Sequence, residues 1–403
     1  MTHIEQMIQD MCPNGVEWKT LGEVCEIETG KLNANAAEEN GHYPFFTTSK
    51  EISYINEYKW DTEALLIAGN ANIGDVKHYI GKFNAYQRTY VLTNFQEGLI
   101  VRFLYHYTKA RLKDFLDDKK NEAAMSYIVL SSLQAFPIPL PPLEIQKKIV
   151  ECLDKFSALA AELQAELQMR RKQYEYYRTQ LLTPHSDCNS ATKPDDCNWE
   201  WKTFAELGVF YGGLSGKSKE DFKDGNAKFI TYLNIGCNPA LRLDISETVK
   251  IGPNERQNIV QYGDALFTGS SETPDECAMS SVVTEQPAEN LYLNSFCFGF
   301  RFNSLDGICP AFYKHYFRSD AFRKAVRRTA NGTTRFNVSK KEFAKLSIPI
   351  PPLAEQERIV SILDKFEALT TSLSDGIPAE QAAQQKRYEY YRDLLLTFPC
   401  KAV

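Results

Sequence analysis

Two segments of the chain have apolar residues at helical spacing over a long distance. In the first, steps of four and three residues alternate through Phe156, Ala160, Leu163, Leu167, Arg170, Tyr174, Tyr177 and Leu181. A period of 3.5 residues is typical of a coiled-coil seam, and only Arg170 interrupts its apolar character. The second segment contains a weaker series, which is Val360, Leu363, Phe366, Leu373, Tyr388, Tyr391 and Leu395. The pattern therefore predicts two long helices.

Prolines mark the limits of both predicted helices. Each helix follows a Pro-Pro pair, at 141–142 and 351–352, where the missing N–H of proline costs little. The second helix contains Asp-Gly-Ile-Pro at 375–378, which should kink or break it, because proline inside a helix removes a hydrogen bond. An inserted length of four residues would nevertheless keep the seam roughly on one face.

The rest of the chain has the pattern of mixed α+β domains. Short β-type runs broken by Gly, Asn and Asp occur at 63–67, 88–92, 228–233 and 291–302, and helical patterns follow at 104–116 and 312–326. A polar stretch with two prolines at 184–198 is a reasonable linker. The predicted organisation is a first domain at 1–140, a helix at 141–183, the linker, a second domain at 199–349 and a second helix at 350–398.

The chain contains an internal duplication. Residues 137–159 recur as residues 347–369, and the sequence Tyr-Glu-Tyr-Tyr-Arg at 174–178 recurs at 388–392. Fainter similarities lie upstream, where Glu-Trp-Lys-Thr occurs at both 17–20 and 200–203. The helical regions are thus nearly identical while the globular regions diverge. A duplicated scaffold that carries two different recognition domains explains this asymmetry; the alternative is two helices that merely pack on their own domains.

With these motifs, the chain resembles the specificity subunits of type I restriction–modification systems over nearly its whole length. The motifs that carry the resemblance are Ile-Pro-Leu-Pro-Pro-Leu at 138–143 with Gln146, Ile-Pro-Ile-Pro-Pro-Leu at 348–353 with Gln356, and the two Tyr-Glu-Tyr-Tyr-Arg segments. The resemblance implies two target-recognition domains joined by two long helices in an antiparallel coiled coil. Each domain would read one half of a bipartite, asymmetric double-stranded DNA site.

The resemblance also implies partners and cofactors. Two modification subunits would methylate adenine with S-adenosylmethionine, and restriction subunits with motor and nuclease activity would use ATP and Mg²⁺. The chain itself would hold no cofactor or metal and would not be an enzyme. Contacts with partner subunits are assigned to the starts of the two helices, at Leu143, Gln146, Leu353 and Gln356.

Other features of the sequence favour a cytoplasmic protein. No apolar run is long enough to cross a membrane, and the first residues lack the basic start and apolar run of a signal peptide. The ten cysteines form no Cys-x-x-Cys pair, so we expect reduced thiols.

The charge of the chain is informative in one segment. The net charge of −6 alone argues against nucleic-acid binding, but the charge at the contact surface is the relevant quantity. Residues 314–345 contain ten Lys or Arg and two acidic residues, a local charge of +8. We expect phosphate contacts in this basic segment, from Lys314, Arg318, Arg323, Lys324, Arg327 and Arg328.

Candidate base-reading residues lie in loops next to the β-type runs. Asn and Gln can pair with adenine, Arg with guanine, and Ser or Thr with base edges or phosphate. In the first domain the candidates are Thr47, Thr48, Ser49, Lys50, Asn70, Asn72, Gln87 and Arg88. In the second they are Tyr232, Asn234, Ser270, Ser271, Thr333, Thr334 and Arg335.

Two alternative functions stay open at the level of sequence. The first is a fused methyltransferase or nuclease, for which residues 212–218 resemble a nucleotide-binding loop and Asp195 with Glu-Trp-Lys at 200–202 hints at a metal nuclease. The loop, however, lacks the required first glycine, and Glu-Trp-Lys recurs at 17–19 without a matching aspartate. The second alternative is a coiled-coil adaptor that does not read DNA.

Overall fold

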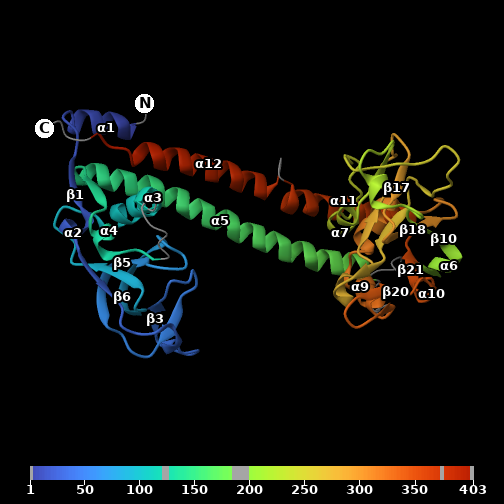
Figure 1. Cartoon of the computed structure of the whole chain (residues 1–403), viewed down its shortest axis with the longest axis horizontal. Helices are drawn as coiled ribbons and strands as arrows, with labels where there is room; N and C mark the ends of the chain where they lie inside the picture. Colours follow the sequence, from blue (N-terminus) through green and yellow to red (C-terminus); the bar gives the residue numbers. More distant parts are fainter. Residues whose placement is uncertain (1–2, 120–126, 184–198, 373–375, 400–403) are drawn as a thin grey trace, which may run out of the picture. The chain divides into compact units, whose positions relative to one another are not determined.

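The computed structural model describes residues 3–119, 127–183, 199–372 and 376–399. The predicted linker at 184–198 and Asp195 lie outside these residues. The chain divides into two compact units, and both ends of the chain belong to the first. Unit 1 comprises residues 1–165 and 380–403, and unit 2 comprises residues 166–379. Figure 1 shows the elements of each unit coloured along the sequence.

The elements of unit 1 follow one another in a mixed order of strands and helices. They are α1 (His3–Met11), β1 (Glu17–Thr20), α2 (Leu21–Val24), β2 (Glu26–Thr29), β3 (Tyr43–Phe46), β4 (Ser53–Ile55), β5 (Trp60–Ala68), β6 (Val76–Ala85), β7 (Thr89–Thr93), α3 (Val101–Lys119), α4 (Leu130–Gln134), β8 (Pro137–Leu140), the first part of α5 (Leu143–Leu182) and most of α12 (Ile377–Leu395). Six strands form one sheet in the order β2-β7-β5-β6-β3-β4, in which only β3 and β6 pair in parallel.

Unit 2 is built from shorter strands. After the second part of α5 come β9 (Glu200–Thr203), α6 (Phe204–Leu207), β10 (Gly208–Gly212), β11 (Ala227–Ile230), α7 (Tyr232–Cys237), β12 (Thr248–Val249), β13 (Ile259–Val260), β14 (Ala265–Thr268), β15 (Ser270–Ser271), β16 (Ser280–Val282), β17 (Leu291–Leu293), β18 (Cys297–Phe302), α8 (Pro310–Tyr316), α9 (Asp320–Arg327), β19 (Ala330–Asn331), β20 (Phe336–Val338), α10 (Lys340–Phe343), β21 (Ser347–Ile350) and α11 (Leu353–Thr371). Two four-stranded sheets have the orders β10-β18-β14-β16 and β12-β11-β17-β13. The predicted mixed α+β fold is confirmed.

The repeated Glu-Trp-Lys-Thr segments close the two domains in the same way. In unit 1 this segment is β1, which pairs antiparallel with β8, so that Glu17 faces Leu140. In unit 2 it is β9, which pairs with β21, so that Glu200 faces Ile350. The last threonine then caps a short helix, because its N–H donates to a glutamate three residues later (2.7 Å in both units). The repeat is therefore structural, which removes the basis for a metal nuclease at 200–202.

The long helices pair antiparallel within each unit. In unit 1, Phe156 of α5 stacks on Tyr391 of α12, with ring centroids 5.5 Å apart. In unit 2, Tyr177 of α5 stacks on Phe366 of α11 at 5.4 Å. The predicted helix break is confirmed, because α11 ends at Thr371 and α12 begins only at Ile377. Figure 1 shows α12 in red beside α5 in green.

Several predicted element boundaries are wrong in detail. The helical pattern at 312–326 is two helices, because α8 ends at Tyr316 with Phe317 as its C-cap, and Ser319 caps α9 through a hydrogen bond from Phe322 N–H. The β-type run at 228–233 ends at Ile230, and Thr231 caps α7. The run at 291–302 is two strands separated by a turn that contains Phe296.

Each unit has its own apolar core. In unit 1 the buried face of α3 packs with α5, β1, β8 and the C-terminal residues Leu395, Leu396 and Phe398. In unit 2 Phe204 lies in the middle of an aromatic cluster, and its ring is 4.8 Å from that of Phe300. Among the described residues, no helix combines the length and apolar character needed to span a membrane, and the seven cysteines are unpaired.

Candidate nucleic-acid interface

A cluster of polar loops in unit 1 is organised around Gly69, which directly follows β5. The N–H of Gly69 donates to the carbonyl of Arg88 (2.9 Å), and its carbonyl accepts from Ile128 N–H (2.7 Å). A Cβ at position 69 would lie 2.7 Å from the Arg88 carbonyl oxygen, so the close approach requires glycine. We call Thr47–Lys50, Asn70–Asn72, Gln87–Arg88 and Tyr127 loop cluster 1.

The same arrangement recurs in unit 2 around Gly269, which directly follows β14. Its N–H donates to the carbonyl of Phe296 (2.8 Å), and its carbonyl accepts from Val338 N–H (3.1 Å). A Cβ at position 269 would lie 2.6 Å from the Phe296 carbonyl oxygen. We call Tyr232–Asn234, Ser270–Ser271, Phe296 and Asn331–Asn337 loop cluster 2. The two divergent domains thus build one backbone frame with different side chains.

The predicted residues of the first domain come together in loop cluster 1. The side-chain amide of Asn72 donates to the carbonyl of Thr48 (2.8 Å), which joins two of the predicted loops. Ser49, Lys50, Gln87 and Arg88 are exposed, Thr47 is half-buried, and the Thr48 side chain is buried. The Asn70 side-chain oxygen is buried and has no hydrogen-bond partner within the described part of the chain.

A small cavity lies inside loop cluster 1. Its volume is about 310 Å³, and its lining includes Gln87, Arg88 and Tyr127. Tyr127, which the sequence did not single out, is 51% exposed. The cavity therefore combines an amide, a guanidinium and an exposed aromatic ring, which are the groups that contact nucleobases.

Three predicted residues of the second domain have mainly structural roles. The Asn234 side chain is used inside its own loop, where its amide donates to the Arg242 carbonyl (2.9 Å). Ser270 and Ser271 are buried, and Ser271 Oγ donates to Glu276 (3.2 Å). The phenol of Tyr232 donates to the Ser270 carbonyl (2.8 Å). We therefore correct the assignment of Asn234, Ser270 and Ser271 as base-reading residues, because their polar groups already have partners or are shielded from solvent.

Of the remaining candidates, Tyr232 begins α7 and the other three lie on the hairpin between β19 and β20. Thr333, Thr334 and Arg335 are exposed on this turn. Sequence reasoning missed two exposed apolar neighbours in loop cluster 2, Phe296 (62% exposed) and Leu233 (71% exposed). A signal for Phe296 was present, because Asn294-Ser295 just before it is typical of a turn.

Three of the six cations predicted to contact phosphate are partly buried and have partners within the fold. The Arg323 guanidinium donates to the carbonyls of Asp275, Cys277 and Ala278. That of Arg318 donates to the carbonyls of Ser280 and Ile235, and burial, followed by the charge of Arg323, lowers the pKa of Arg318 to about 10. The structure disfavours Lys314, Arg318 and Arg323 for the predicted phosphate contacts, because these cations are partly buried and have hydrogen-bond or ion-pair partners within the fold.

Lys314 is enclosed by carboxylates. Its ammonium lies 2.8 Å from Asp364 and 3.3 Å from Glu367 on α11. His315, Asp364 and Glu367 have the spacing of a metal site, but the Lys314 ammonium occupies a cation position beside them. Lys324, Arg327 and Arg328 are exposed, and Arg327 is paired with Asp275 at 3.0 Å. Lys324 and Arg328 therefore remain candidates for phosphate contacts.

The residues assigned to partner contacts divide into two kinds. Leu143 and Leu353 are 44% and 43% exposed. Gln146 and Gln356 are fully buried at the same position of the two repeats. The assignment of both glutamines to partner binding is therefore corrected, because no partner can reach their side chains.

The glutamines instead join each domain to its helix. The Gln146 oxygen accepts from Ile100 N–H (2.8 Å), and its amide donates to the carbonyls of Gly98 (2.9 Å) and Pro141 (2.8 Å). Gln356 makes the equivalent three bonds, with Cys309 N–H and the carbonyls of Gly307 and Pro351. In each side chain, the amide oxygen and the amide nitrogen are thus hydrogen-bonded to backbone groups inside the fold.

The loop that resembles a nucleotide-binding loop has another role. Lys217 is tied to the Glu255 carboxylate at 2.6 Å and also donates to the Lys250 carbonyl. Glu255 further accepts from Gly252 N–H, and these hydrogen bonds lower the pKa of Glu255 to about 2. Lys217 is therefore held away from a phosphate, and the interpretation as a nucleotide-binding loop has no support.

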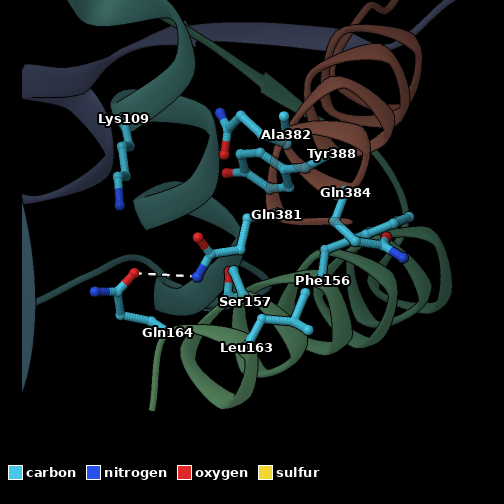
Figure 2. A pocket seen from close by; sticks show the side chains of 11 residues that line it. Lys109, Phe156, Ser157, Leu163, Gln164, Gln381, Ala382, Gln384 and Tyr388 are labelled. Carbon is cyan, nitrogen blue, oxygen red and sulfur yellow. Dashed lines mark hydrogen bonds between the residues drawn. The ribbon is translucent and has the colours of Figure 1, made fainter. Parts of the chain in front are cut away.

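Unit 1 has a second cavity beside its helix pair. Figure 2 shows α3, α5 and α12 around it, with Gln381 pointing toward Gln164 and donating to it at 3.1 Å. The volume is about 540 Å³, and the lining residues are Lys109, Phe156, Ser157, Ala160, Leu163, Gln164, Gln381, Ala382, Gln384, Gln385 and Tyr388. This lining contains no carboxylate or imidazole, so the cavity does not have the composition of a hydrolytic or metal site.

Comparisons with known proteins agree with the duplicated organisation. Residues 13–169 and 197–381 match the family profile described as the type I restriction modification DNA specificity domain. A putative type I restriction enzyme specificity subunit of Haemophilus influenzae is 31% identical over 427 residues, which cover 98% of each chain. A type I restriction enzyme specificity subunit of Escherichia coli is 29% identical over 425 residues, which cover 99% of this chain and 98% of the relative.

A solved structure shows the same fold. The crystal structure of an S subunit of a type I restriction–modification system from M. genitalium has a TM-score of 0.53 and 16% sequence identity, and the match covers 94% of this chain and 95% of that chain. Each of the two segments that match the profile covers one globular region and part of the helical region that follows it, and together they make up most of the chain. The chain therefore belongs to the family of type I restriction–modification specificity subunits.

Proposed function

We propose that this chain is the DNA-recognition subunit of a type I restriction–modification complex, and that its two loop clusters read two different half-sites. The observation that carries this proposal is the shared backbone frame around Gly69 and Gly269. The residue whose carbonyl accepts the hydrogen bond from the glycine N–H is Arg88 in loop cluster 1 and Phe296 in loop cluster 2. One frame with different side chains suits two different base sequences, and hence a bipartite, asymmetric site.

The exposed groups of loop cluster 1 match the chemistry of base edges. Arg88 can donate to guanine O6 and N7, and Gln87 can pair with adenine. Lys50 is exposed in the neighbouring turn and can contact phosphate. The cavity between Arg88 and Tyr127 gives room for a base edge.

The exposed groups of loop cluster 2 divide into reading and positioning residues. Thr333, Thr334 and Arg335 project from a hairpin, while Lys324 and Arg328 lie exposed at the end of the neighbouring helix α9. Cations on a helix suit phosphate contacts that fix the register, and a hairpin turn suits entry into a groove. A contact surface of this kind is compatible with a net charge of −6, because only the local charge matters.

Catalysis in such a complex would belong to other subunits. We infer that modification subunits supply adenine methylation with S-adenosylmethionine, and that restriction subunits supply ATP- and Mg²⁺-dependent cleavage, in the cytoplasm. Two residue sets of this chain that resemble catalytic sites support this division. Lys217 forms an ion pair with Glu255, and the carboxylate of Asp364 near His315 forms an ion pair with Lys314.

Methylome sequencing of the host with and without this chain tests the proposal. We expect adenine methylation at one bipartite, asymmetric motif, which disappears when the chain is deleted. Methylation at a single continuous palindrome would contradict the two-reader proposal. The purified chain, incubated alone with DNA and S-adenosylmethionine, should transfer no methyl group; transfer would show that the chain is itself a methyltransferase.

A further inference from the structure

Phe296 and Arg335 form an exposed pair within loop cluster 2. The guanidinium carbon of Arg335 lies 5.9 Å from the centroid of the Phe296 ring, which is the geometry of a cation–π contact. The two residues come from different turns, one between β17 and β18 and the other between β19 and β20. In the described part of the chain, no hydrogen bond or ion pair engages the exposed Arg335 guanidinium, so its donors are available to a ligand.

The backbone holds the Phe296 side of the pair in place. Phe296 N–H donates to the Asn294 side-chain oxygen (2.9 Å), and the Phe296 carbonyl accepts from Gly269 N–H (2.8 Å). The backbone N–H and the carbonyl of Phe296 are thus both hydrogen-bonded within the fold. A ring that is 62% exposed is thus attached to a fixed turn instead of a free loop.

The backbone also constrains Arg335. Gly332 has φ of +144°, and a Cβ there would lie 2.1 Å from the Arg335 carbonyl oxygen. Only glycine allows this turn, which returns the chain into β20. Arg335 is therefore presented by the hairpin of β19 and β20, and Phe296 by the turn that connects β17 in one sheet with β18 in another.

Base-edge chemistry then assigns a ligand to each side chain. Arginine recognises guanine through O6 and N7 in the major groove, and a phenyl ring contacts the 5-methyl group of thymine. The 5.9 Å between the two groups is compatible with contacts to neighbouring base pairs, which are about 3.4 Å apart. We propose that Phe296 and Arg335 act as one unit that reads a thymine next to a guanine in the half-site of unit 2. This inference rests on the proposed function.

Two observations favour this role over others. The guanidinium covers one face of the ring, so Phe296 cannot insert between base pairs as a wedge without first displacing Arg335. In loop cluster 1 the residue that accepts from the glycine N–H is Arg88, which occupies the place of Phe296. An apolar contact with a thymine methyl group at this position is therefore specific to unit 2. We therefore expect methyl-group recognition in one half-site at this frame position, and not in the other.

Changes to single functional groups of the DNA bases test the proposal on the assembled complex with its modification subunits. The probe is a 30-base-pair duplex that contains the motif found by methylome sequencing. Replacing the thymine by deoxyuridine removes one methyl group and should weaken binding about fourfold. Replacing the neighbouring guanine by 7-deazaguanine removes N7 and should weaken binding about fivefold or more.

Variants connect each DNA change to one side chain. Phe296→Ala should bind the thymine and deoxyuridine duplexes equally, and Arg335→Ala should bind the guanine and 7-deazaguanine duplexes equally. Phe296→Leu keeps an apolar contact and provides a second variant if Phe296→Ala does not assemble. Arg88→Ala in unit 1 is the matched control, which should keep both effects in the half-site of unit 2.

The outcomes separate this inference from the proposed function. A half-site of unit 2 without a thymine–guanine step, or a deoxyuridine effect that persists in Phe296→Ala, would overturn the inference alone. Loss of partner-subunit assembly in both Phe296 variants, with each chain still folded, would also overturn it, because Phe296 would then be a protein contact. If the wild-type complex does not distinguish the specific duplex from a scrambled one, the proposed function itself is wrong.

Discussion

His106 of α3 donates a hydrogen bond from Nε2 to the carboxylate of Asp154 in α5, over 2.8 Å. The same relationship recurs in unit 2, where His315 of α8 donates to Asp364 of α11 over 2.6 Å. Both imidazoles are buried, and both aspartates belong to the repeated Leu-Asp-Lys-Phe sequence. The duplicated helices thus hold their divergent domains by the same buried contact, and this contact has measurable consequences.

Acid should weaken unit 1 through His106. Burial lowers the pKa of His106, although the hydrogen bond with Asp154 acts in the opposite direction. The unfolded chain therefore binds more protons below a pH of about 6.5, so the stability is present above that pH and is lost as the pH falls. We expect His106→Gln to reduce the dependence of the unfolding free energy on pH between about 7 and 5, measured by urea denaturation followed by circular dichroism.

The control for this prediction is His42→Gln, which changes an exposed histidine of the same unit. A change of the slope that both variants share would not be specific to His106. Equal slopes for His106→Gln and the wild type would show that His106 does not titrate on unfolding.

Removing the buried Gln146 should destabilise unit 1 strongly. Gln146→Leu leaves Ile100 N–H and the carbonyls of Gly98 and Pro141 without their partner. Pro141 is buried, Ile100 is half-buried and Gly98 is exposed. Since an unsatisfied buried group costs about 1–3 kcal/mol and water can reach the Gly98 carbonyl, we expect a loss of about 2 kcal/mol or more in the free energy of unfolding. Lys147→Ala, at the exposed next position, should stay within about 0.5 kcal/mol of the wild type. A loss below about 1 kcal/mol for Gln146→Leu would mean that water replaces the side chain.

The basic segment should separate into two classes of residue. The double variant Lys324→Ala with Arg328→Ala should weaken binding of the assembled complex to all duplexes alike and lower the slope of log affinity against log salt by about two. Arg318→Ala removes hydrogen bonds to Ser280 and Ile235 and should instead lower the melting temperature. Binding across salt concentrations and thermal unfolding of each variant distinguish the classes. An unchanged melting temperature for Arg318→Ala would contradict its structural role.

Domain exchange should change one half of the DNA site. Residues 16–136 include β1 and end just before its partner β8, so the exchanged domain must itself supply a strand that pairs with β8. Replacement of this range by the equivalent of a relative should alter only the half-site of unit 1 in the methylome. A change in both halves would show that the domains do not read DNA separately.

The sequence alone determined the organisation of this protein. The duplication is visible because the two helices have the same structural role. Each helix has one glutamine and one aspartate that bind its domain, and apolar residues that form the helix–helix contact. The helix break was predictable because Gly376 and Pro378 act through local backbone geometry. Periodicity did not reveal that Ser319 separates α8 from α9, because the apolar residues keep their spacing across the break.

The tertiary structure alone decided which polar residues are free to bind. Arg323 and Lys324 are neighbours of the same charge, yet Arg323 is bound by three carbonyls of residues 275–278 and Lys324 is exposed. Arg335 and Phe296 come from different turns and meet only because the chain folds around Gly269 and Gly332. Residue type and helical spacing are local properties, whereas the burial of a charge depends on which distant backbone groups lie against it.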